Sequence, residues 1–222
     1  MKERPILFSA PMVRALLEGR KTQTRRVMKP RPPGDLMHVV RLTSRAFFRF
    51  YGDDHSAFAY DCPYGQPGDR LWVRETFYCD DFRYPDGPKD ELRERLEYRA
   101  DHRCANWEAG CPCRDDQGRG GWRPSIHMPR WASRITLEVT DVRVERLQDI
   151  SEEDAKAEGA EFHDGREVGH SGWRHDCHHG FVYATAREGF AALWDSINGP
   201  DSWKANPWVW AITFSRRTED KP

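Results

Sequence analysis

The sequence predicts an α+β fold, a small barrel-like β-sheet flanked by helices. Segments with helical periodicity alternate with strand-like segments, and residues 133–147 alternate between apolar and polar side chains. Residues 206–215 are apolar on both faces, which is typical of a strand in the centre of a sheet. The chain has 222 residues, enough for one domain with sizeable insertions. We expect one domain over residues 1–222, with surface insertions at about 30–66, 78–122 and 160–183.

The first predicted helix follows Ser9, a good N-cap residue, and carries Pro11 in its first turn. Gly19 supplies the left-handed residue that ends such a helix. The stretch 20–26 therefore leaves a helix C-terminus, and we expect it to enter a strand.

Three later segments have strand patterns. Residues 39–52 indicate one strand or one arm of a hairpin, and residues 67–77 give a turn followed by a strand. In residues 133–147 the apolar positions change parity at Val142, which predicts a bulge or bend near Asp141.

Two more helices are predicted before the closing strand. In the first, Ser151 is the N-cap, Asp154 completes a capping box, and Gly159 ends the helix. The second covers residues 186–199 and has one apolar side, formed by Phe190, Leu193, Trp194 and Ile197.

Positive charge is concentrated locally. The net charge of −1 does not indicate nucleic-acid binding, but six cations lie between Gly19 and Gly34: Arg20, Lys21, Arg25, Arg26, Lys29 and Arg31. Such a stretch is either a solvated face, a phosphate clamp or part of a catalytic site. The hydroxyl of Thr22 or Thr24 can act as a nucleophile if a lysine or carboxylate accepts its proton. An exposed lysine, with a pKa of about 10.4, is a poor base at neutral pH, so this role requires a buried lysine.

Two further groups are candidates for chemistry. Glu158 lies in the last turn of its helix, where the helix dipole disfavours a carboxylate, so it is either functional or an exposed glutamate without a role. Residues 122–134 interleave cations with aromatic rings, as in surfaces that stack on bases and bind phosphates; the cations and ring are Arg123, Arg130, Trp131 and Arg134. His127 is a candidate acid or base near neutral pH. The alternative for this stretch is a loop over the barrel, with Trp131 in the core.

The six cysteines do not indicate a disulfide framework, because no secretion signal accompanies them. Two Cys/His groups are candidate zinc ligands: His102, Cys104, Cys111 and Cys113, and His170, His175, Cys177, His178 and His179. Neither has the C-x₂-C spacing of common zinc modules, so free thiols and a His-rich loop are the preferred interpretation and metal binding stays open. No apolar run approaches a membrane span, and we expect a soluble, cytoplasmic protein without a cofactor.

Several of these stretches together resemble the ASCH domain family of the PUA-like superfamily. The resemblance rests on "LLEGRKTQTRR", "GDRLWVRE", "DISEEDAKAEG" and the closing "W.W.ITF". The longer stretches 5–27 and 124–151 are similar to ASCH proteins encoded in phages and prophages. Matching segments cover roughly half of the chain, and the three insertions lie outside them.

The resemblance implies a small PUA-like β-barrel with a cleft that faces nucleic acid or a nucleoside. Some small ASCH proteins hydrolyse the amide of N4-acetylcytidine with a lysine and a threonine of the G-R-K-T-x-T motif and a glutamate. These match Lys21, Thr24 and, through the A-x-x-E pattern that begins at Ala155, Glu158. We expect a metal-independent amide hydrolase of this type.

Its partners would be RNA or a modified nucleoside or nucleotide, with no membrane, and the oligomeric state stays open. Contacts to substrate or nucleic acid are expected from Arg20, Thr22, Arg25, Arg26, Arg130, Trp131 and Arg134. The alternatives are a non-catalytic RNA-binding module and a ribonuclease, in which the cations contact phosphates.

Overall fold

The structure is a computed structural model. It describes residues 1–32, 36–42, 46–52, 57–78, 96–101, 122–164, 171–174 and 182–217. The described α-helices are α1 (Ala10–Leu17), α3 (Glu152–Ala157) and α4 (Ala186–Asn198). The described strands are β1 (Glu3–Leu7), β2 (Gln23–Val27), β3 (Leu36–Arg41), β4 (Phe47–Gly52), β5 (Ala57–Asp61), β6 (Arg70–Arg74), β7 (Phe77–Tyr78), β8 (Glu97–Tyr98), β9 (Thr136–Arg146), β10 (Glu161–His163), β11 (Gly172–Arg174) and β12 (Trp208–Arg216).

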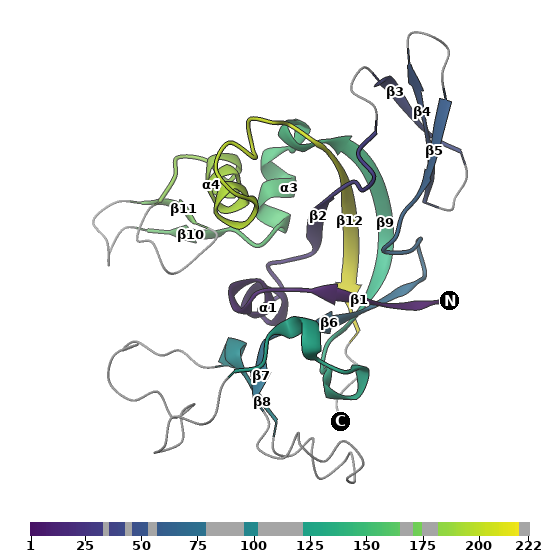
Figure 1. The fold of residues 1–222 in the computed structure, drawn as a ribbon. Helices are drawn as coiled ribbons and strands as arrows, with labels where there is room; N and C mark the ends of the chain where they lie inside the picture. Colours follow the sequence, from purple (N-terminus) through teal and green to yellow (C-terminus); the bar gives the residue numbers. More distant parts are fainter. Residues whose placement is uncertain are drawn as a thin grey trace.

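A five-stranded sheet with the order β1-β6-β9-β12-β2 forms the centre of the molecule (Figure 1). β1 and β6 are parallel, and the other neighbours are antiparallel. β12 lies between β9 and β2, and Val209, Trp210, Ala211 and Ile212 in it are all buried. The prediction of a central closing strand is therefore confirmed, because both faces of β12 are covered.

The α+β class is confirmed, but the predicted barrel is not closed in the described part of the chain. No strand pairing among the described residues joins the two outer strands, β1 and β2. The beginning of β2 is covered instead by the end of α3. The backbone amide of Thr22 donates to the carbonyl of Ala157 at 2.8 Å, and Lys21 forms a single antiparallel bridge with Glu158.

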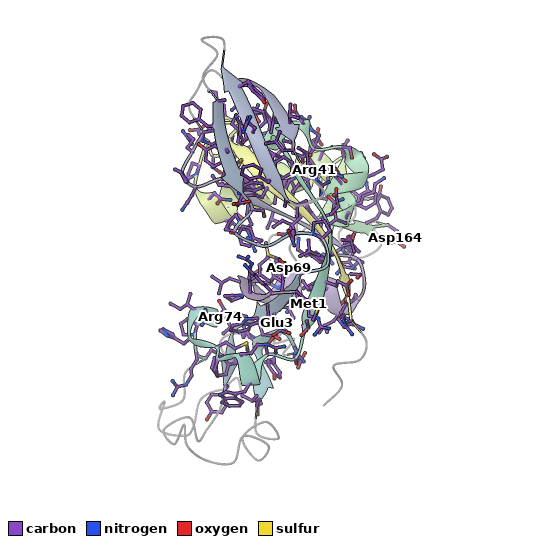
Figure 2. All side chains as sticks on the ribbon, turned by 90° about the vertical axis from the view of Figure 1, so that its right-hand side faces the viewer. Met1, Glu3, Arg41, Asp69, Arg74 and Asp164 are labelled. Atoms are coloured by element: carbon purple, nitrogen blue, oxygen red, sulfur yellow. The ribbon has the colours of Figure 1, made fainter. Side chains whose placement is uncertain are left out.

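The segment after β2 folds into a second sheet, β3-β4-β5. It exceeds the one strand or hairpin arm predicted there, and its aromatic side chains join the main core. The ring of Phe48 lies 5.5 Å from that of Trp210, and the ring of Phe50 lies 5.2 Å from that of Trp208. In Figure 2, Arg41 marks this upper sheet, well above Glu3 of β1.

The predicted bulge in β9 is confirmed. The register between β9 and β12 shifts where Thr213 pairs with Asp141 and Phe214 pairs with Val139, so Thr140 has no partner in the ladder. Beside the bulge, Asp141 binds Arg41 of β3 through an ion pair of 2.8 Å.

The helices α1 and α3 begin at the predicted N-cap residues, but their capping hydrogen bonds differ from those predicted. Ser9 is the N-cap of α1, but its side chain accepts no capping hydrogen bond, whereas the Ser151 hydroxyl accepts one from the amide of Asp154 at 3.1 Å. The carboxylate of Asp154 does not complete the predicted capping box, because it binds side chains of β2 and β9. A full capping box, formed by Thr185 and Glu188, begins α4.

No helix in the part of the chain that the structure describes is long and apolar enough to cross a membrane. The Cys/His groups at 102–113 and 170–179 lie outside the described residues. Cys62 is described and buried, and burial raises the pKa of its thiol to about 12.

Replacing Trp210 with alanine should lower the free energy of unfolding by about 3–5 kcal/mol, because a buried ring is lost from the central strand and leaves a cavity. Urea denaturation followed by circular dichroism measures this change. Ile126→Ala is the control, since Ile126 is 56% exposed and its loss should change stability by less than about 0.5 kcal/mol. Equal losses in the two variants would contradict the central position of Trp210.

Candidate functional site

A small pocket lies beside the edge strand β2 and is lined by residues of α1, β2, α4 and the C-cap of α3. Its volume of about 60 Å³ gives room for several water molecules. The lining residues are Met12 from α1, residues 24–27 of β2, Glu158 after α3, and Phe190, Leu193, Trp194, Ile197 and Asn198 from α4.

Lys21 and Glu158 form a buried ion pair next to this pocket. The Nζ of Lys21 donates to Glu158 Oε2 at 2.7 Å and to the carbonyl oxygen of Glu158 at 2.8 Å. The side chain of Lys21 is fully buried and that of Glu158 is 4% exposed. The predicted requirement for a buried lysine is therefore met at Lys21.

The local backbone explains why these two residues meet. Glu158 is the C-cap of α3, and Gly159 follows with a φ of +107°, so the chain turns back toward α1. A Cβ at Gly159 would lie 3.0 Å from the Cβ of Ala15 and 3.3 Å from that of Lys21. Only glycine fits this turn and this close approach without displacement.

Burial lowers the pKa of Lys21, and the carboxylate of Glu158 offsets part of this effect. Less free energy is therefore needed to deprotonate Lys21 than to deprotonate an exposed lysine at the same pH. A neutral amine can accept a proton, which is the property that a general base needs.

Arg25 holds the other oxygen of Glu158. Its Nη1 donates to Glu158 Oε1 at 3.2 Å, its Nη2 lies 3.0 Å from Asp154 Oδ2, and its Nε donates to Glu145 Oε1 at 2.8 Å. Burial opposes its charge, but the surrounding carboxylates keep the pKa of Arg25 above its ordinary value. Three carboxylates within the fold thus bind the guanidinium of Arg25. The carboxylate of Glu158 is held by Lys21 at one oxygen and by Arg25 at the other.

Thr24 lines the pocket together with Glu158 and is 1% exposed. No side-chain hydrogen bond of Thr24 is found within the described part of the chain. Its backbone is fixed in β2, opposite Ile212 of β12. The structure therefore brings Thr24 and Glu158 to one pocket and binds Lys21 to Glu158.

The other predicted residues of the motif lie around this pair. Arg20 donates to the carbonyl of Gly159 at 2.6 Å and binds Glu18, and the side chain of Thr22 is exposed. Arg26 lines the pocket, with its guanidinium 5.4 Å from the ring of Phe8.

Trp131 and Arg134 belong to a different part of the molecule, near β7 and β8, and Arg130 lies beside β1 and β6. Arg134 pairs with Glu75 at 2.9 Å and with Asp101 at 2.7 Å, and its guanidinium carbon lies 3.9 Å from the ring centre of Tyr98. These contacts hold its pKa above the ordinary value although burial opposes its charge.

Two neighbouring residues of this stretch also make contacts within the protein. Arg130 is paired with Glu3, and Trp131 packs against the cluster around Phe77 and Met128. His127 is exposed.

Sequence reasoning missed two features of the site. The first is the role of the apolar side of α4, because Phe190, Leu193, Trp194 and Ile197 line the pocket. The second is the binding of Glu145 and Asp154 to Arg25, which no local pattern predicts, because an acidic residue is ordinary in the first turn of a helix and at a polar position of a strand.

No group of three or more His, Cys, Asp or Glu residues in the described ranges could hold a metal ion.

Comparison with protein-family models, curated proteins and solved structures finds no match to the chain. What the site can do chemically follows from its own groups. A hydroxyl-bearing residue and a fixed carboxylate at the pocket, with a buried amine bound to that carboxylate, are the components of nucleophilic acyl transfer.

Gly159→Ala should destabilise the protein by more than about 1 kcal/mol, because the new Cβ meets Ala15 and Lys21 and the backbone has a positive φ. Thermal and urea denaturation measure the loss. Gly19→Ala is the matched control: its φ is +77°, but its Cβ would meet nothing within 4 Å, so only the backbone strain remains. A loss at Gly159 no larger than that at Gly19 would contradict the close approach.

The stability of Lys21→Met relative to wild type should depend on pH. Because the pKa of Lys21 is lowered on folding, the unfolded chain binds more protons between that pKa and 10.5. Wild type should therefore gain stability relative to Lys21→Met as pH rises from about 7 toward about 9.5. Urea denaturation of both proteins across this range tests the sign, and a relative loss for wild type would mean that the fold raises the pKa of Lys21.

Proposed function

We propose that the protein hydrolyses the amide of an N4-acetylcytidine-type nucleoside, with Thr24 as nucleophile and Lys21 and Glu158 as the proton-transfer groups. The observation that supports this most directly is the pocket, which is lined by Thr24 and by Glu158, whose carboxylate is bound to the buried amine of Lys21. These are the three positions that the resemblance to ASCH proteins singles out.

We propose a PUA-like fold of the ASCH type for the same chain. The mixed α+β architecture supports it, as does the contact between the G-R-K-T-x-T stretch and the end of α3. In this proposal the described five-stranded sheet is the wall of the barrel that carries the site.

In the first half of the reaction, the Thr24 oxygen attacks the acyl carbon and Lys21, in its neutral form, accepts the hydroxyl proton. Arg26 lines the pocket and supplies positive charge for the oxyanion that develops on the acyl oxygen. The carbon–nitrogen bond then breaks, and the leaving amine takes a proton through Glu158. Cytidine departs, and an acyl ester remains on Thr24.

In the second half, water attacks this ester and gives up its proton to the Lys21–Glu158 pair. The bond between the acyl carbon and Thr24 breaks, Thr24 regains its proton, and acetate leaves. The sum is one amide and one water converted into one amine and one carboxylic acid. No metal takes part in this proposal.

The alternatives with open phosphate contacts receive less support from the geometry. A non-catalytic RNA-binding module or a ribonuclease needs cations that face solvent or a phosphate. Lys21 and Arg25 are instead buried and paired inside the fold, and Arg134 is bound to two carboxylates. These pairings favour a small acylated nucleoside over RNA as the substrate.

Thr24→Val should abolish the release of cytidine from N4-acetylcytidine, a loss of at least about a hundredfold, while the fold is retained because the two side chains have nearly the same shape. Liquid chromatography of the reaction measures the product. Thr140→Val is the matched control: it removes an exposed threonine hydroxyl on β9, outside the lining of the pocket, and should keep the activity of wild type.

The same assay includes Glu158→Gln and a mixed RNA pool. Loss of activity in Glu158→Gln would support its role in proton transfer. Full activity of Thr24→Val would reject the mechanism. Intact N4-acetylcytidine with fragmented RNA would replace the proposal with a ribonuclease, and intact RNA that binds to the protein would replace it with an RNA-binding module.

A further inference from the structure

The pocket lies at the open edge of β2, where the two faces of the sheet meet. It is lined by residues 24–27 of this strand, whose side chains alternate between the two faces. Met12 of α1 packs on the core cluster that contains Ile212. Leu193 of α4 packs on the cluster that contains Val209, whose position on β12 has the opposite parity. The two helices therefore cover opposite faces, and a pocket that both of them line lies at the edge of the outer strand β2.

The hydrogen bonds between β2 and β12 show which backbone groups face this edge. The amide of Met28 donates to the carbonyl of Trp208 at 3.0 Å. The amide of Phe214 donates to the carbonyl of Thr22 at 2.9 Å. Because bonded and non-bonded pairs alternate along an antiparallel ladder, the even-numbered residues of β2 are those that bond to β12. The N–H and C=O of Arg25 therefore point away from β12, toward the open edge and the pocket.

The chain itself places the amide of Arg25 next to the proposed nucleophile. Arg25 directly follows Thr24, so its nitrogen stays close to the Thr24 hydroxyl in every rotamer of that side chain. When this hydroxyl attacks an acyl carbon in the pocket, the acyl oxygen comes within reach of the same N–H. Hydrolases with a serine nucleophile use the amide of the next residue in this way, as one donor of an oxyanion hole.

We propose that the backbone N–H of Arg25 is an oxyanion donor: it binds the acyl oxygen of the substrate and stabilises the negative charge that this oxygen takes when Thr24 attacks. This inference rests on the proposed function for the acylated nucleoside. The ladder bonds of the residues on either side hold the donor in place, so it needs no reorganisation during the reaction. Three carboxylates bind the side chain of Arg25, so its backbone is the part that meets the substrate.

The first test removes this N–H and leaves every side chain in place. Chemical ligation at Cys62 gives the full chain with synthetic residues 1–61, in which an ester replaces the peptide bond between Thr24 and Arg25. Release of cytidine from N4-acetylcytidine should then fall at least about a hundredfold in kcat, the effect of one lost oxyanion donor. The change in KM should be much smaller, because the hydrogen bond strengthens mainly in the transition state.

The matched control is an ester between Thr22 and Gln23. It also removes an N–H that points away from β12, and it also weakens a carbonyl that accepts a ladder bond, that of Thr22. Gln23 does not line the pocket, so this chain should keep the kcat of the ligated chain without an ester. The two esters should lower thermal stability by similar amounts, because each weakens one ladder acceptor.

Nuclear magnetic resonance tests the contact without turnover. In Thr24→Val, N4-acetylcytidine should shift the amide proton of Arg25 and slow its exchange with solvent. Cytidine lacks the acyl oxygen and should do neither, and the amide of Gln23 should respond to neither ligand. Equal loss of kcat in the two esters, an equal response to the two ligands, or no response at Arg25 overturns the proposal.

The two readouts separate this inference from the proposed function. If N4-acetylcytidine is hydrolysed and the ester before Arg25 has the kcat of its control, the role of this amide fails and the hydrolase stands. If nothing is hydrolysed but the amide of Arg25 responds to N4-acetylcytidine alone, the hydrolase fails and the contact with the acyl oxygen stands.

Discussion

The contact between Lys21 and Glu158 is the constraint on which the site depends. Their ion pair is buried, and the two residues are 137 positions apart in the chain. A buried lysine is tolerated only when its charge is paired or lost, so the end of α3 has to lie against the beginning of β2. The bridge between their backbones and the glycine after Glu158 make this approach possible. The same contact covers the edge of β2 where a further strand would otherwise pair.

Arg25 extends this constraint to the charges around it. It binds Glu158, Asp154 and Glu145, so one guanidinium connects β2 with the end of α3 and with β9. Because Lys21 and Arg25 hold separate oxygens of Glu158, that carboxylate has one orientation. Thr24 lies between them in sequence, and its hydroxyl has no such partner among the described residues. The network thus fixes the charged side chains around Thr24 and does not include its hydroxyl.

A second, partly buried charge cluster shows the same use of arginine. Arg134 binds Glu75 and Asp101 and lies over the ring of Tyr98. It connects the start of β9 with the small β7–β8 sheet through contacts that are far apart in the sequence. Cations interleaved with aromatic rings are typical of nucleic-acid surfaces, but the same composition can also join structural elements. Only the partners of each guanidinium distinguish these two uses.

The sequence by itself determined those features that depend on short-range patterns. It predicted the α+β class, the helix ends at Gly19 and Gly159, the bulge near Asp141 and the central closing strand, because caps, turns and alternation act over a few residues. It also singled out Lys21, Thr24 and Glu158, two of them from one motif. The tertiary structure alone decided which side chains meet.

The tertiary structure buries Lys21 and gives Arg25 three carboxylate partners. It also leaves the sheet open in the described part of the chain and places Trp194 at the pocket. These outcomes depend on contacts between residues more than 100 positions apart in the chain. A local pattern cannot encode them, because the partner of a charge is set by how the elements pack.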